Sequence, residues 1–240
     1  MFLLDAGNTR LKAALFGPAD ERIFREFPNS DTEAMEGLIR DWGHYPGMVC
    51  SSRGNEAALK ATLSGSPVSF LEWEMMPGFR PAYAQPETMG KDRLAAIAGA
   101  MARFPGRALC VADAGTCLTT DFLSPEGLHL GGTISPGLEM RLESLHAFTG
   151  SLPRVPAVGP LPGLGNSTET CIRSGAAGGL VLELDSLVSN SRAQFGMVFE
   201  LVLTGGDAKF LANRLKTDNF VAPHLVFEGL FAILKSRIST

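Results

Sequence analysis

The sequence contains one short unit twice, and this repeat restricts the possible fold more than any other feature. An apolar run at residues 2–4 leads into Asp5-Ala6-Gly7, and a second at residues 109–112 leads into Asp113-Ala114-Gly115. Each unit is typical of a buried strand, a tight turn and a second strand that pairs back on the first. The repeat therefore predicts two related domains with a cleft between them, which is a common place for a ligand to bind.

The first copy of the unit carries the residue types of a phosphate site. Gly7 permits the backbone of a tight turn, and Asn8 and Thr9 add short polar side chains and backbone N–H groups. A carboxylate such as Asp5, at a strand end beside N–H donors, can hold a hydrated divalent cation together with phosphate oxygens. An ordinary Asp-x-Gly-Asn hairpin is the alternative, and this stretch alone leaves both interpretations open.

The composition argues against several classes of function. The net charge of −4 and the lack of Lys- or Arg-rich runs provide no basic surface for nucleic acid or for a membrane. The four cysteines and four histidines are scattered without metal-ligand spacing, so neither a zinc site nor a disulfide framework is expected. The N-terminus does not resemble a signal peptide, and no apolar run is long enough for a membrane helix. We therefore expect a cytoplasmic protein.

The first half of the chain, residues 1–107, has the pattern of a mixed α/β domain. Three strands precede alternating helices and strands, in the order β-β-β-α-β-α-β over residues 2–71. A proline-rich loop at residues 75–88 contains Tyr83 and leads to Asp92, in the first turn of a helix. Residues 94–103 of that helix are mostly small, which predicts close packing against another element or another chain. On position alone, Asp92 is an ordinary N-terminal helix acid.

The second half, residues 108–240, has a similar pattern. Strands are expected at residues 119–123, 129–134 and 197–203, and helices at 138–148, 170–190, 208–215 and 224–235. Gly131 and Gly132 fall within a predicted strand, which indicates close approach of backbone or ligand. The small residues at 175–179 lie inside a predicted helix and indicate tight helix packing rather than a phosphate loop. The turn at residues 204–207 precedes a helix, where backbone N–H groups suit an anion or ribose hydroxyls.

With these motifs in order, the sequence resembles the acetate and sugar kinase, heat-shock protein 70 and actin superfamily, and more narrowly the type III pantothenate kinases. The resemblance extends almost from end to end. Two departures are Met89, where leucine is more usual, and Ser167-Thr168, where many members have Asn-Thr. The matching motifs are Asp5-x-Gly7-Asn8-Thr9-x-x-Lys12, Tyr83-x-x-Pro86-x-x-Met89-Gly90-x-Asp92-Arg93, Asp113-x-Gly115-Thr116-x-x-Thr119-x-Asp121, Gly131-Gly132-x-Ile134-x-Pro136-Gly137, Leu152-Pro153 and Thr204-Gly205-Gly206-Asp207.

The resemblance implies an α/β fold of two tandem ribonuclease H-like (actin-like ATPase) domains with a nucleotide cleft between them. The implied activity is ATP-dependent phosphorylation of the primary hydroxyl of pantothenate, the first step of coenzyme A synthesis. The resemblance also implies a requirement for Mg²⁺ or another divalent cation, a monovalent cation such as potassium or ammonium, and a homodimer.

The resemblance further implies roles for individual residues. Asp92 would be the catalytic base on the substrate hydroxyl, and Arg93 would pair with the pantothenate carboxylate. Asp5 would organise magnesium through water, and Asp121 would help to bind the monovalent cation. Other substrate contacts are expected from Tyr83, Gly90, Lys91 and Thr168, and nucleotide or phosphate contacts from Asp5, Gly7, Asn8, Thr9, Lys12, Gly115, Thr116, Gly205 and Gly206.

Three alternatives remain open from the residues themselves. Lys12 could pair with Asp5 structurally instead of contacting phosphate. The chain could be another small-molecule kinase of the superfamily, because the phosphate motifs would be the same. It could also be a non-catalytic regulatory protein of the same fold, which would be expected to lose site residues. The sequence contains neither the P-loop motif nor the Gly-x-Gly-x-x-Gly dinucleotide motif, which argues against those two nucleotide folds.

Overall fold

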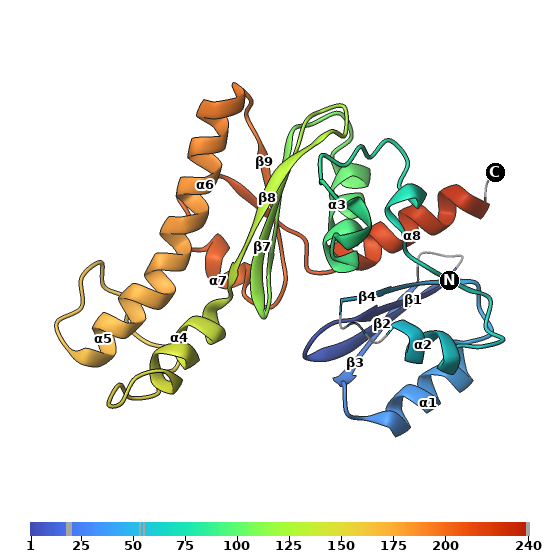
Figure 1. Ribbon diagram of the computed structural model, residues 1–240, viewed down its shortest axis with the longest axis horizontal. Coiled ribbons are helices and arrows are strands. Elements are labelled where there is room, and N and C mark those ends of the chain that lie inside the picture. The colour runs from blue at the N-terminus through green and yellow to red at the C-terminus, as the bar shows by residue number, and fades with distance from the viewer. Residues whose placement is uncertain (18–20, 53, 55, 239–240) are drawn as a thin grey trace. The chain divides into compact units, whose positions relative to one another are not determined.

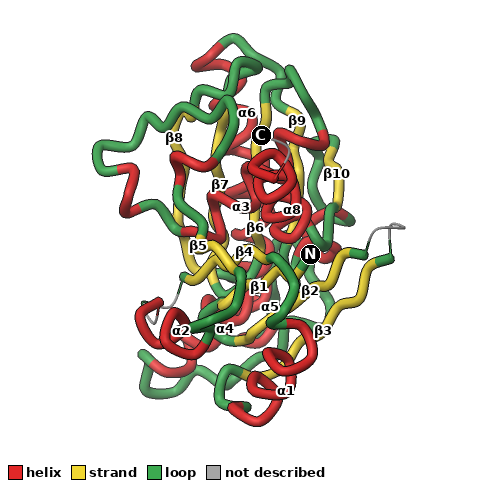
Figure 2. The backbone as a smooth tube through the Cα atoms, turned by 90° about the vertical axis from the view of Figure 1, so that its right-hand side faces the viewer, coloured by secondary structure: helices red, strands yellow, loops and turns green. Residues whose placement is uncertain are grey.

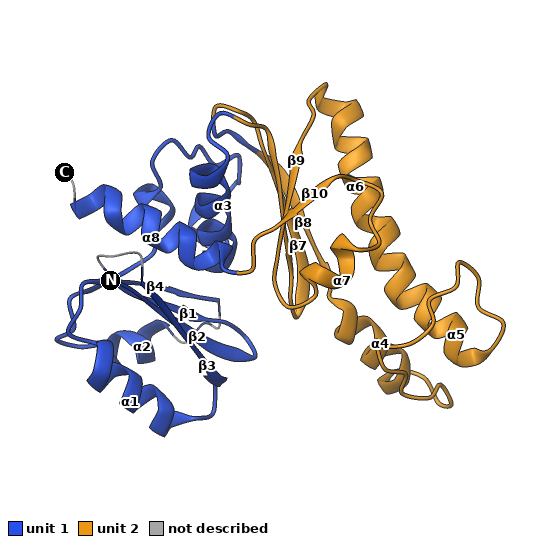
Figure 3. Cartoon of the chain, turned by 180° about the vertical axis from the view of Figure 1, so that it is seen from behind, with its two compact units in different colours: residues 1–106, 127–129, 224–240 blue, residues 107–126, 130–223 orange. Residues whose placement is uncertain are grey.

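The structure is a computed structural model that describes residues 1–17, 21–52, 54 and 56–238. The chain falls into two compact units, shown in different colours in Figure 3. Unit 1 comprises Met1–Gly106, Gly127–His129 and His224–Thr240, and unit 2 comprises Arg107–Glu126 and Leu130–Pro223. The predicted division into residues 1–107 and 108–240 differs from this grouping, because the C-terminal segment from His224 packs with unit 1.

Unit 1 is built on a mixed sheet with the strand order β3-β2-β1-β4-β5. β1 is antiparallel to β2, β2 is antiparallel to β3, and β4 and β5 continue the sheet in parallel with β1. The order of elements is the predicted one. The elements are β1 (Phe2–Ala6), β2 (Arg10–Phe16), β3 (Arg22–Pro28), α1 (Thr32–Trp42), β4 (Gly47–Ser51), α2 (Glu56–Thr62) and β5 (Val68–Phe70).

The two faces of this sheet are covered by different helices. α1 and α2 lie on one face, and α3 (Lys91–Arg103) and α8 (Leu225–Ile238) lie on the other (Figure 1). Alternation along β1 sends Phe2, Leu4 and Ala6 into the core with α1 and α2. The intervening residues Leu3 and Asp5 therefore point to the face that α3 and α8 cover.

Helices α3 and α8 pack with almost no space between their backbones. A Cβ on Gly229 would lie 1.8 Å from the carbonyl oxygen of Ala95, and a Cβ on Gly99 would lie 2.3 Å from that of Leu225. The small residues at 94–103 are therefore explained by packing within this chain. The sequence predicted that this helix packs against either another element of the chain or another chain. In the structure its partner is α8 of the same chain.

The segment before α3 is largely irregular, as its prolines predict. It contains the short 3-10 turns η1 (Trp73–Met75) and η2 (Pro86–Thr88). Arg80 in this segment pairs with residues 127–129: its N–H donates to the Gly127 carbonyl, and its own carbonyl accepts from the His129 N–H, both at 2.9 Å. These bonds explain why Gly127–His129 belongs to unit 1.

Unit 2 contains a second mixed sheet, with the order β10-β9-β6-β7-β8 (Figure 2). β6 is antiparallel to β7 and parallel to β9. The short strand β10 was not expected from the sequence. The strands are β6 (Leu109–Ala114), β7 (Cys117–Leu123), β8 (His129–Pro136), β9 (Glu200–Thr204) and β10 (Asn219–Val221).

The helices of unit 2 form one core with one face of this sheet. Their buried side chains pack against Cys110, Ala112, Leu118 and Phe122 of β6 and β7. The predicted helix at 170–190 is divided by a π-helical turn, which contains residues 175–178 of the predicted small segment. The helical elements are α4 (Leu138–Ala147), α5 (Thr168–Arg173), η3 (Ser174–Gly178), α6 (Gly179–Phe195) and α7 (Ala208–Ala212).

None of the helices in the described part of the chain is both long enough and apolar enough to cross a membrane.

Candidate active site

Asp5 lies near the end of β1 with 9% of its surface exposed. The strand register places Lys12 of β2 opposite it on one side and Cys50 of β4 on the other. The Cys50 thiol donates to Asp5 Oδ1, with 3.5 Å between sulfur and oxygen. Burial raises the pKa of Asp5 to about 6; Lys12 lowers this pKa and Asp92 raises it. Asp5 is thus a buried carboxylate between one cation and a second carboxylate.

The turn after β1 contains Gly7, Asn8 and Thr9. The Gly7 N–H donates to the Arg10 carbonyl at 3.1 Å, and Asn8 and Thr9 are exposed. Gly7 does not adopt a left-handed φ, so the turn does not need glycine for its dihedral angles. A Cβ there would lie 3.2 Å from the Arg10 carbonyl oxygen, so a larger residue would require this carbonyl to shift by a few tenths of an ångström.

Asn29 supports this turn, although no sequence motif indicated it. Its Nδ2 donates to the carbonyl oxygens of Gly7, at 3.1 Å, and Asn8, at 2.7 Å. The residue follows β3 directly, and β3 is aligned with β2 so that Pro28 lies opposite Arg10. The contact therefore depends on strand register rather than on a local pattern.

The start of α3 places Asp92 and Gly90 together. Asp92 Oδ1 accepts the backbone N–H of Arg93 at 2.8 Å, so the carboxylate lies at the N-terminus of the helix, where the dipole favours negative charge. A Cβ on Gly90 would lie 2.7 Å from Asp92 Oδ1. Gly90 therefore provides space for the Asp92 carboxylate.

Arg93 and Tyr83, both predicted to bind substrate, are in direct contact. Arg93 is 5% exposed, and its Nη1 donates to the Tyr83 hydroxyl at 3.0 Å. The guanidinium carbon also lies 5.4 Å from the centre of the tyrosine ring, within range of a cation–π contact. The Tyr83 ring packs against buried His129, with 5.9 Å between ring centres. Neighbouring Lys91 forms an ion pair with Glu72.

The second glycine turn has the same form but is one residue shorter. The Gly115 N–H donates to the Cys117 carbonyl at 2.9 Å. Thr119 lies opposite Asp113, whereas Lys12 lies opposite Asp5. The constant offset that the sequence repeat suggested therefore ends at Gly115, and Thr119 occupies the place that Lys12 has in the first turn.

Two neighbouring segments of unit 2 contact this second turn through backbone atoms. The Gly137 N–H donates to the Thr116 carbonyl at 3.0 Å, and the Asp207 N–H donates to the Ala114 carbonyl at 2.9 Å. A Cβ on Gly137 would lie 2.2 Å from the Gly115 carbonyl oxygen.

The predicted adenosine motif supplies the second of these segments. A Cβ on Gly205, whose φ is +89°, would lie 2.4 Å from the Ala114 carbonyl oxygen. Gly206 has no atom within 4 Å of such a Cβ. Gly205 is therefore fixed by the fold, whereas Gly206 lies in open space.

Asp121, the predicted monovalent-cation residue, lies in β7 with 2% of its surface exposed. The β6–β7 register puts it on the same sheet face as Thr119 and Asp113, opposite to the core face. Its carboxylate also raises the pKa of the Cys110 thiol, after the larger effect of burial.

Thr168 is exposed at the first position of α5. Ser167 caps this helix by accepting the Thr170 N–H at 3.3 Å, while the Thr170 hydroxyl accepts the Ser167 N–H at 2.9 Å. Thr168 belongs to a hollow of about 920 Å³ within unit 2. The hollow is lined by Leu145, Leu152, Gly165, Asn166, Ser167, Thr168, Cys171, Ile172 and Gly175.

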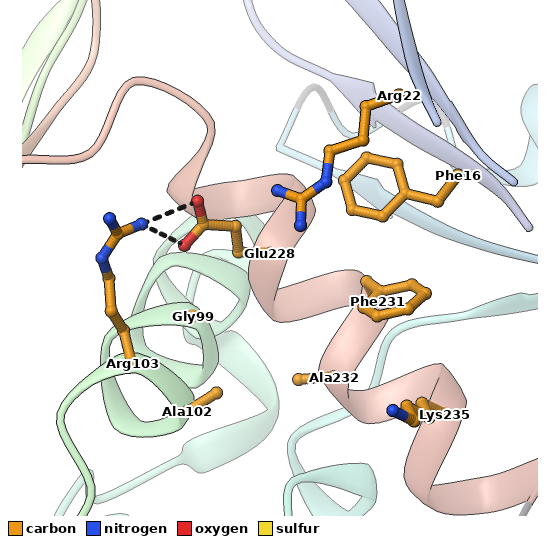
Figure 4. Close-up of a pocket in the computed structure, with 9 residues that line it drawn as sticks. All are labelled: Phe16, Arg22, Gly99, Ala102, Arg103, Glu228, Phe231, Ala232 and Lys235. Atoms are coloured by element: carbon orange, nitrogen blue, oxygen red, sulfur yellow. Dashed lines mark hydrogen bonds and ion pairs between the residues drawn. The ribbon is translucent and has the colours of Figure 1, made fainter. Parts of the chain in front are cut away.

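Another hollow, of about 480 Å³, lies beside α3 and α8 in unit 1 (Figure 4). Arg103 donates to both carboxylate oxygens of Glu228 at its edge, at 2.9 and 3.0 Å. None of the predicted site residues is among those that line it, which are Phe16, Arg22, Gly99, Ala102, Arg103, Glu228, Phe231, Ala232 and Lys235.

The predicted site residues are therefore distributed over both units. Unit 1 brings Asp5, Lys12 and Asp92 into electrostatic contact, and Tyr83 into contact with Arg93. Unit 2 brings the Gly115-Thr116 turn together with Gly205. Sequence reasoning missed Asn29, Cys50, Glu72 and His129, because their contacts come from the packing of separate segments.

Oxygen ligands suit Mg²⁺, and Asp5 together with the nearby Asp92 offers carboxylate oxygens of this kind. Burial and the neighbouring Asp92 carboxylate both disfavour ionisation of Asp5, as its raised pKa indicates. A bound cation would favour the ionised form of Asp5.

Comparison with known proteins gives one family for the sequence. Residues 1–190 match the family profile of type III pantothenate kinase. A protein of that name from Flavobacterium johnsoniae is 37% identical over 239 residues, which cover 98% of this chain and 97% of the relative.

Solved structures share the fold at lower identity. A Campylobacter jejuni protein named as a Baf family transcriptional activator has a TM-score of 0.69 and 21% identity, over 100% of both chains. The activator of 2-hydroxyisocaproyl-CoA dehydratase from Clostridium difficile, with bound ADPNP, has a TM-score of 0.55 and 12% identity, over 100% of this chain and 96% of that one. At these identities the likeness shows the fold alone. It confirms the predicted class, a two-domain α/β fold of the actin-like ATPase type.

Proposed function

The chain belongs to the type III pantothenate kinase family, and from this premise we propose how its residues carry out the reaction. The reaction is the phosphorylation of pantothenate with ATP as co-substrate, in coenzyme A biosynthesis. The observation that carries our assignment of residues is the cluster in unit 1. There the carboxylates of Asp5 and Asp92 interact electrostatically, and Arg93, the residue that follows Asp92, donates a hydrogen bond to the Tyr83 hydroxyl.

We infer that Asp92 is the general base on the primary hydroxyl of pantothenate. An ionised carboxylate can accept the hydroxyl proton as the oxygen attacks the γ-phosphorus of ATP. Asp92 lies in the first turn of α3, beside the backbone N–H groups of the helix N-terminus. Gly90 supports the role because it leaves space for the carboxylate.

We assign the pantothenate carboxylate to Arg93. A guanidinium presents two parallel N–H donors to a planar anion, and the Tyr83 hydroxyl holds one nitrogen of this guanidinium in place. Tyr83, Gly90, Lys91 and Thr168 complete our proposed set of substrate-binding residues. Lys91, the first residue of α3, forms an ion pair with Glu72.

We assign the phosphates of ATP to residues of both glycine turns. Asn8, Thr9 and Lys12 act with Gly7 in unit 1, and Gly115 and Thr116 act in unit 2. Asp5 would hold a divalent cation through water, and such an ion would supply positive charge to the phosphates of ATP. Gly205 and Gly206 contact the adenosine. Asp121, a buried carboxylate, binds a monovalent cation such as potassium or ammonium.

We also propose a homodimer located in the cytoplasm. Unit 2 exposes large apolar side chains, including Phe148, Val158 and Leu164, which are 86–92% exposed. Such side chains favour association when they gather on one surface. The four cysteines are free thiols, which agrees with a reducing compartment.

A substrate panel tests the function as a whole. Pantothenate, pantetheine and a hexose are each offered with ATP and Mg²⁺, with and without potassium, and ADP release is measured. We expect turnover of pantothenate that increases with potassium. Turnover of the hexose without turnover of pantothenate would instead indicate another kinase of the superfamily. Binding of pantothenate without any turnover would indicate a regulatory protein.

Replacement of the proposed base tests the mechanism. We expect Asp92→Asn to keep the fold and pantothenate affinity but to lower kcat by roughly a hundred- to ten-thousand-fold, because it keeps the shape and loses the base. Glu87→Gln, an exposed acid of the same segment, is the matched control and should keep kcat. Near-normal turnover by Asp92→Asn would contradict the assignment.

A further inference from the structure

We propose that Asn29 is a positioning residue for ATP, because it sets the direction in which the first glycine turn presents its backbone N–H groups. The proposal rests on the proposed function of that turn as a phosphate site. Asn29 itself is not placed in contact with ATP. It acts through the peptide planes of the turn.

The fold brings Asn29 to the turn from a distant part of the sequence. Pro28 is the last residue of β3 and is paired with Arg10, the first residue of β2. Asn29 continues beyond this pair, beside the residues that precede Arg10. On its other side, the Asp31 carboxylate caps α1 by accepting the Ala34 N–H at 2.9 Å. Asn29 is thus fixed between the end of a strand and the start of a helix.

Two hydrogen bonds from Asn29 fix two consecutive peptide planes. The carbonyls of Gly7 and Asn8 both accept from Asn29 Nδ2, so both point toward this side chain. In a trans peptide the N–H points opposite to the C=O of the same plane, and the described chain contains no cis peptide. The N–H groups of Asn8 and Thr9 therefore point away from Asn29. Asn8 and Thr9 are exposed residues, and successive backbone N–H groups in a turn of this kind suit an anion such as phosphate.

The orientation of the Asn29 amide is set by the same contacts. Its Oδ1 is buried, without a hydrogen-bond partner among the described residues. Turning the amide over would place this oxygen against two carbonyl oxygens, which also accept hydrogen bonds. The side chain is therefore held by its two donor contacts even though its acceptor is left unpaired.

This geometry gives Asn29 an effect that a space-filling residue would lack. Two N–H groups fixed in one direction bind phosphate oxygens without reorganisation when ATP arrives. Without Asn29 the two peptide planes can rotate, and ATP has to order them on binding. Affinity for ATP should fall, whereas affinity for pantothenate should not change.

Three variants distinguish a positioning role of Asn29 from a space-filling role. Asn29→Ala removes the donor, Asn29→Leu removes it at similar volume, and Asn29→Asp keeps the shape but turns an acceptor toward the two carbonyls. Asn213→Ala, at an exposed asparagine of unit 2, is the matched control. The measurements are KM for ATP, KM for pantothenate, kcat, and calorimetric affinity for a non-hydrolysable ATP analogue.

We expect Asn29→Ala and Asn29→Leu to raise KM for ATP and to weaken analogue binding by roughly tenfold. Asn29→Asp should do so more strongly, and in all three the KM for pantothenate should stay within about twofold. Circular dichroism establishes that each variant is folded. Unchanged ATP and analogue affinity in folded Asn29→Ala and Asn29→Leu would overturn the proposal. Failure of all three variants to fold would also overturn it, because the residue would then be structural.

The analogue measurement separates this proposal from the proposed function. If the wild-type protein does not phosphorylate pantothenate, the proposed function fails. Analogue binding would still show whether Asn29 positions the turn. If wild-type turnover is normal and the variants bind the analogue like wild type, only the positioning proposal fails.

Discussion

The two glycine turns share a sequence motif but are held in different ways. In unit 1 the turn is held by a side chain, because Asn29 Nδ2 donates hydrogen bonds to the carbonyls of Gly7 and Asn8. In unit 2 the backbone N–H groups of Gly137 and Asp207 bond the carbonyls of Thr116 and Ala114. The residue opposite the aspartate also differs, since Asp5 faces Lys12 and Asp113 faces Thr119.

This difference shows which substitutions each turn can tolerate. A contact made by a side chain can be removed while the backbone stays in place, so changes around the first turn should affect binding and protonation. A contact made between backbones leaves no space for a Cβ, as Gly137 and Gly205 show. Changes there should affect folding first.

The largest expected effect on stability comes from adding one methyl group at Gly205, in the segment that packs against the second turn. Gly205→Ala would place a Cβ 2.4 Å from a carbonyl oxygen at a φ of +89°, and we expect it to lower the free energy of unfolding by about 4 kcal/mol. Gly206→Ala is the matched control, because no atom lies within 4 Å of its Cβ. Urea unfolding of both variants measures the difference. Equal stability of the two variants would contradict the claim that close backbone contacts hold the second turn.

The second prediction concerns the buried carboxylate of the first turn. Because the pKa of Asp5 is raised to about 6, the folded state holds a proton between about pH 4 and 6 that the unfolded chain has released. This group therefore makes the protein less stable as the pH rises through that window, by about 3 kcal/mol in all. We expect Asp5→Asn to be more stable than wild type at pH 7, by about 3 kcal/mol, and to be inactive.

Urea unfolding at pH 4 and pH 7 tests this prediction. At pH 4 the two proteins should have similar stability, since Asp5 is then protonated in the folded state. An Asp5→Asn variant that is less stable than wild type at pH 7 would contradict this prediction. It would show that Lys12 and Cys50 stabilise the ionised carboxylate by more than burial destabilises it.

The smallest expected effect is a shift in pH dependence on removal of Lys12. Lys12 lowers the pKa of Asp5, so Lys12→Met should raise that pKa above about 6. The acid limb of kcat/KM for ATP should then move to higher pH, by about half a pH unit. Thr119→Val, the corresponding change in the second turn, should leave this limb in place. An acid limb that does not move in Lys12→Met would show that Asp5 does not control it.

The sequence predicts what depends on local pattern. Alternation and turn residues were sufficient for the order of elements in unit 1, and the recurrence of Asp-Ala-Gly was sufficient for two similar sheets. The family motifs also located Tyr83 and Arg93, which the structure shows in contact. These features are visible because the residues that determine them are neighbours in the chain.

Features that depend on pairing between distant segments could not be predicted. Asn29 reaches the first turn only because Pro28 pairs with Arg10. Only the strand register reveals that the second turn is shorter, since Thr119 lies opposite Asp113 whereas Lys12 lies opposite Asp5. Likewise, small residues in α3 indicate close packing but do not say that α8 is the partner.

The identity of the product tests the central claim most directly. Pantothenate is incubated with ATP, Mg²⁺, potassium and the wild-type protein, and the product is examined by mass spectrometry and phosphorus NMR. We predict one phosphate ester, on the primary hydroxyl of pantothenate, formed in equal amount with ADP. Release of ADP with pantothenate left unmodified would contradict the assignment of this chain as a pantothenate kinase.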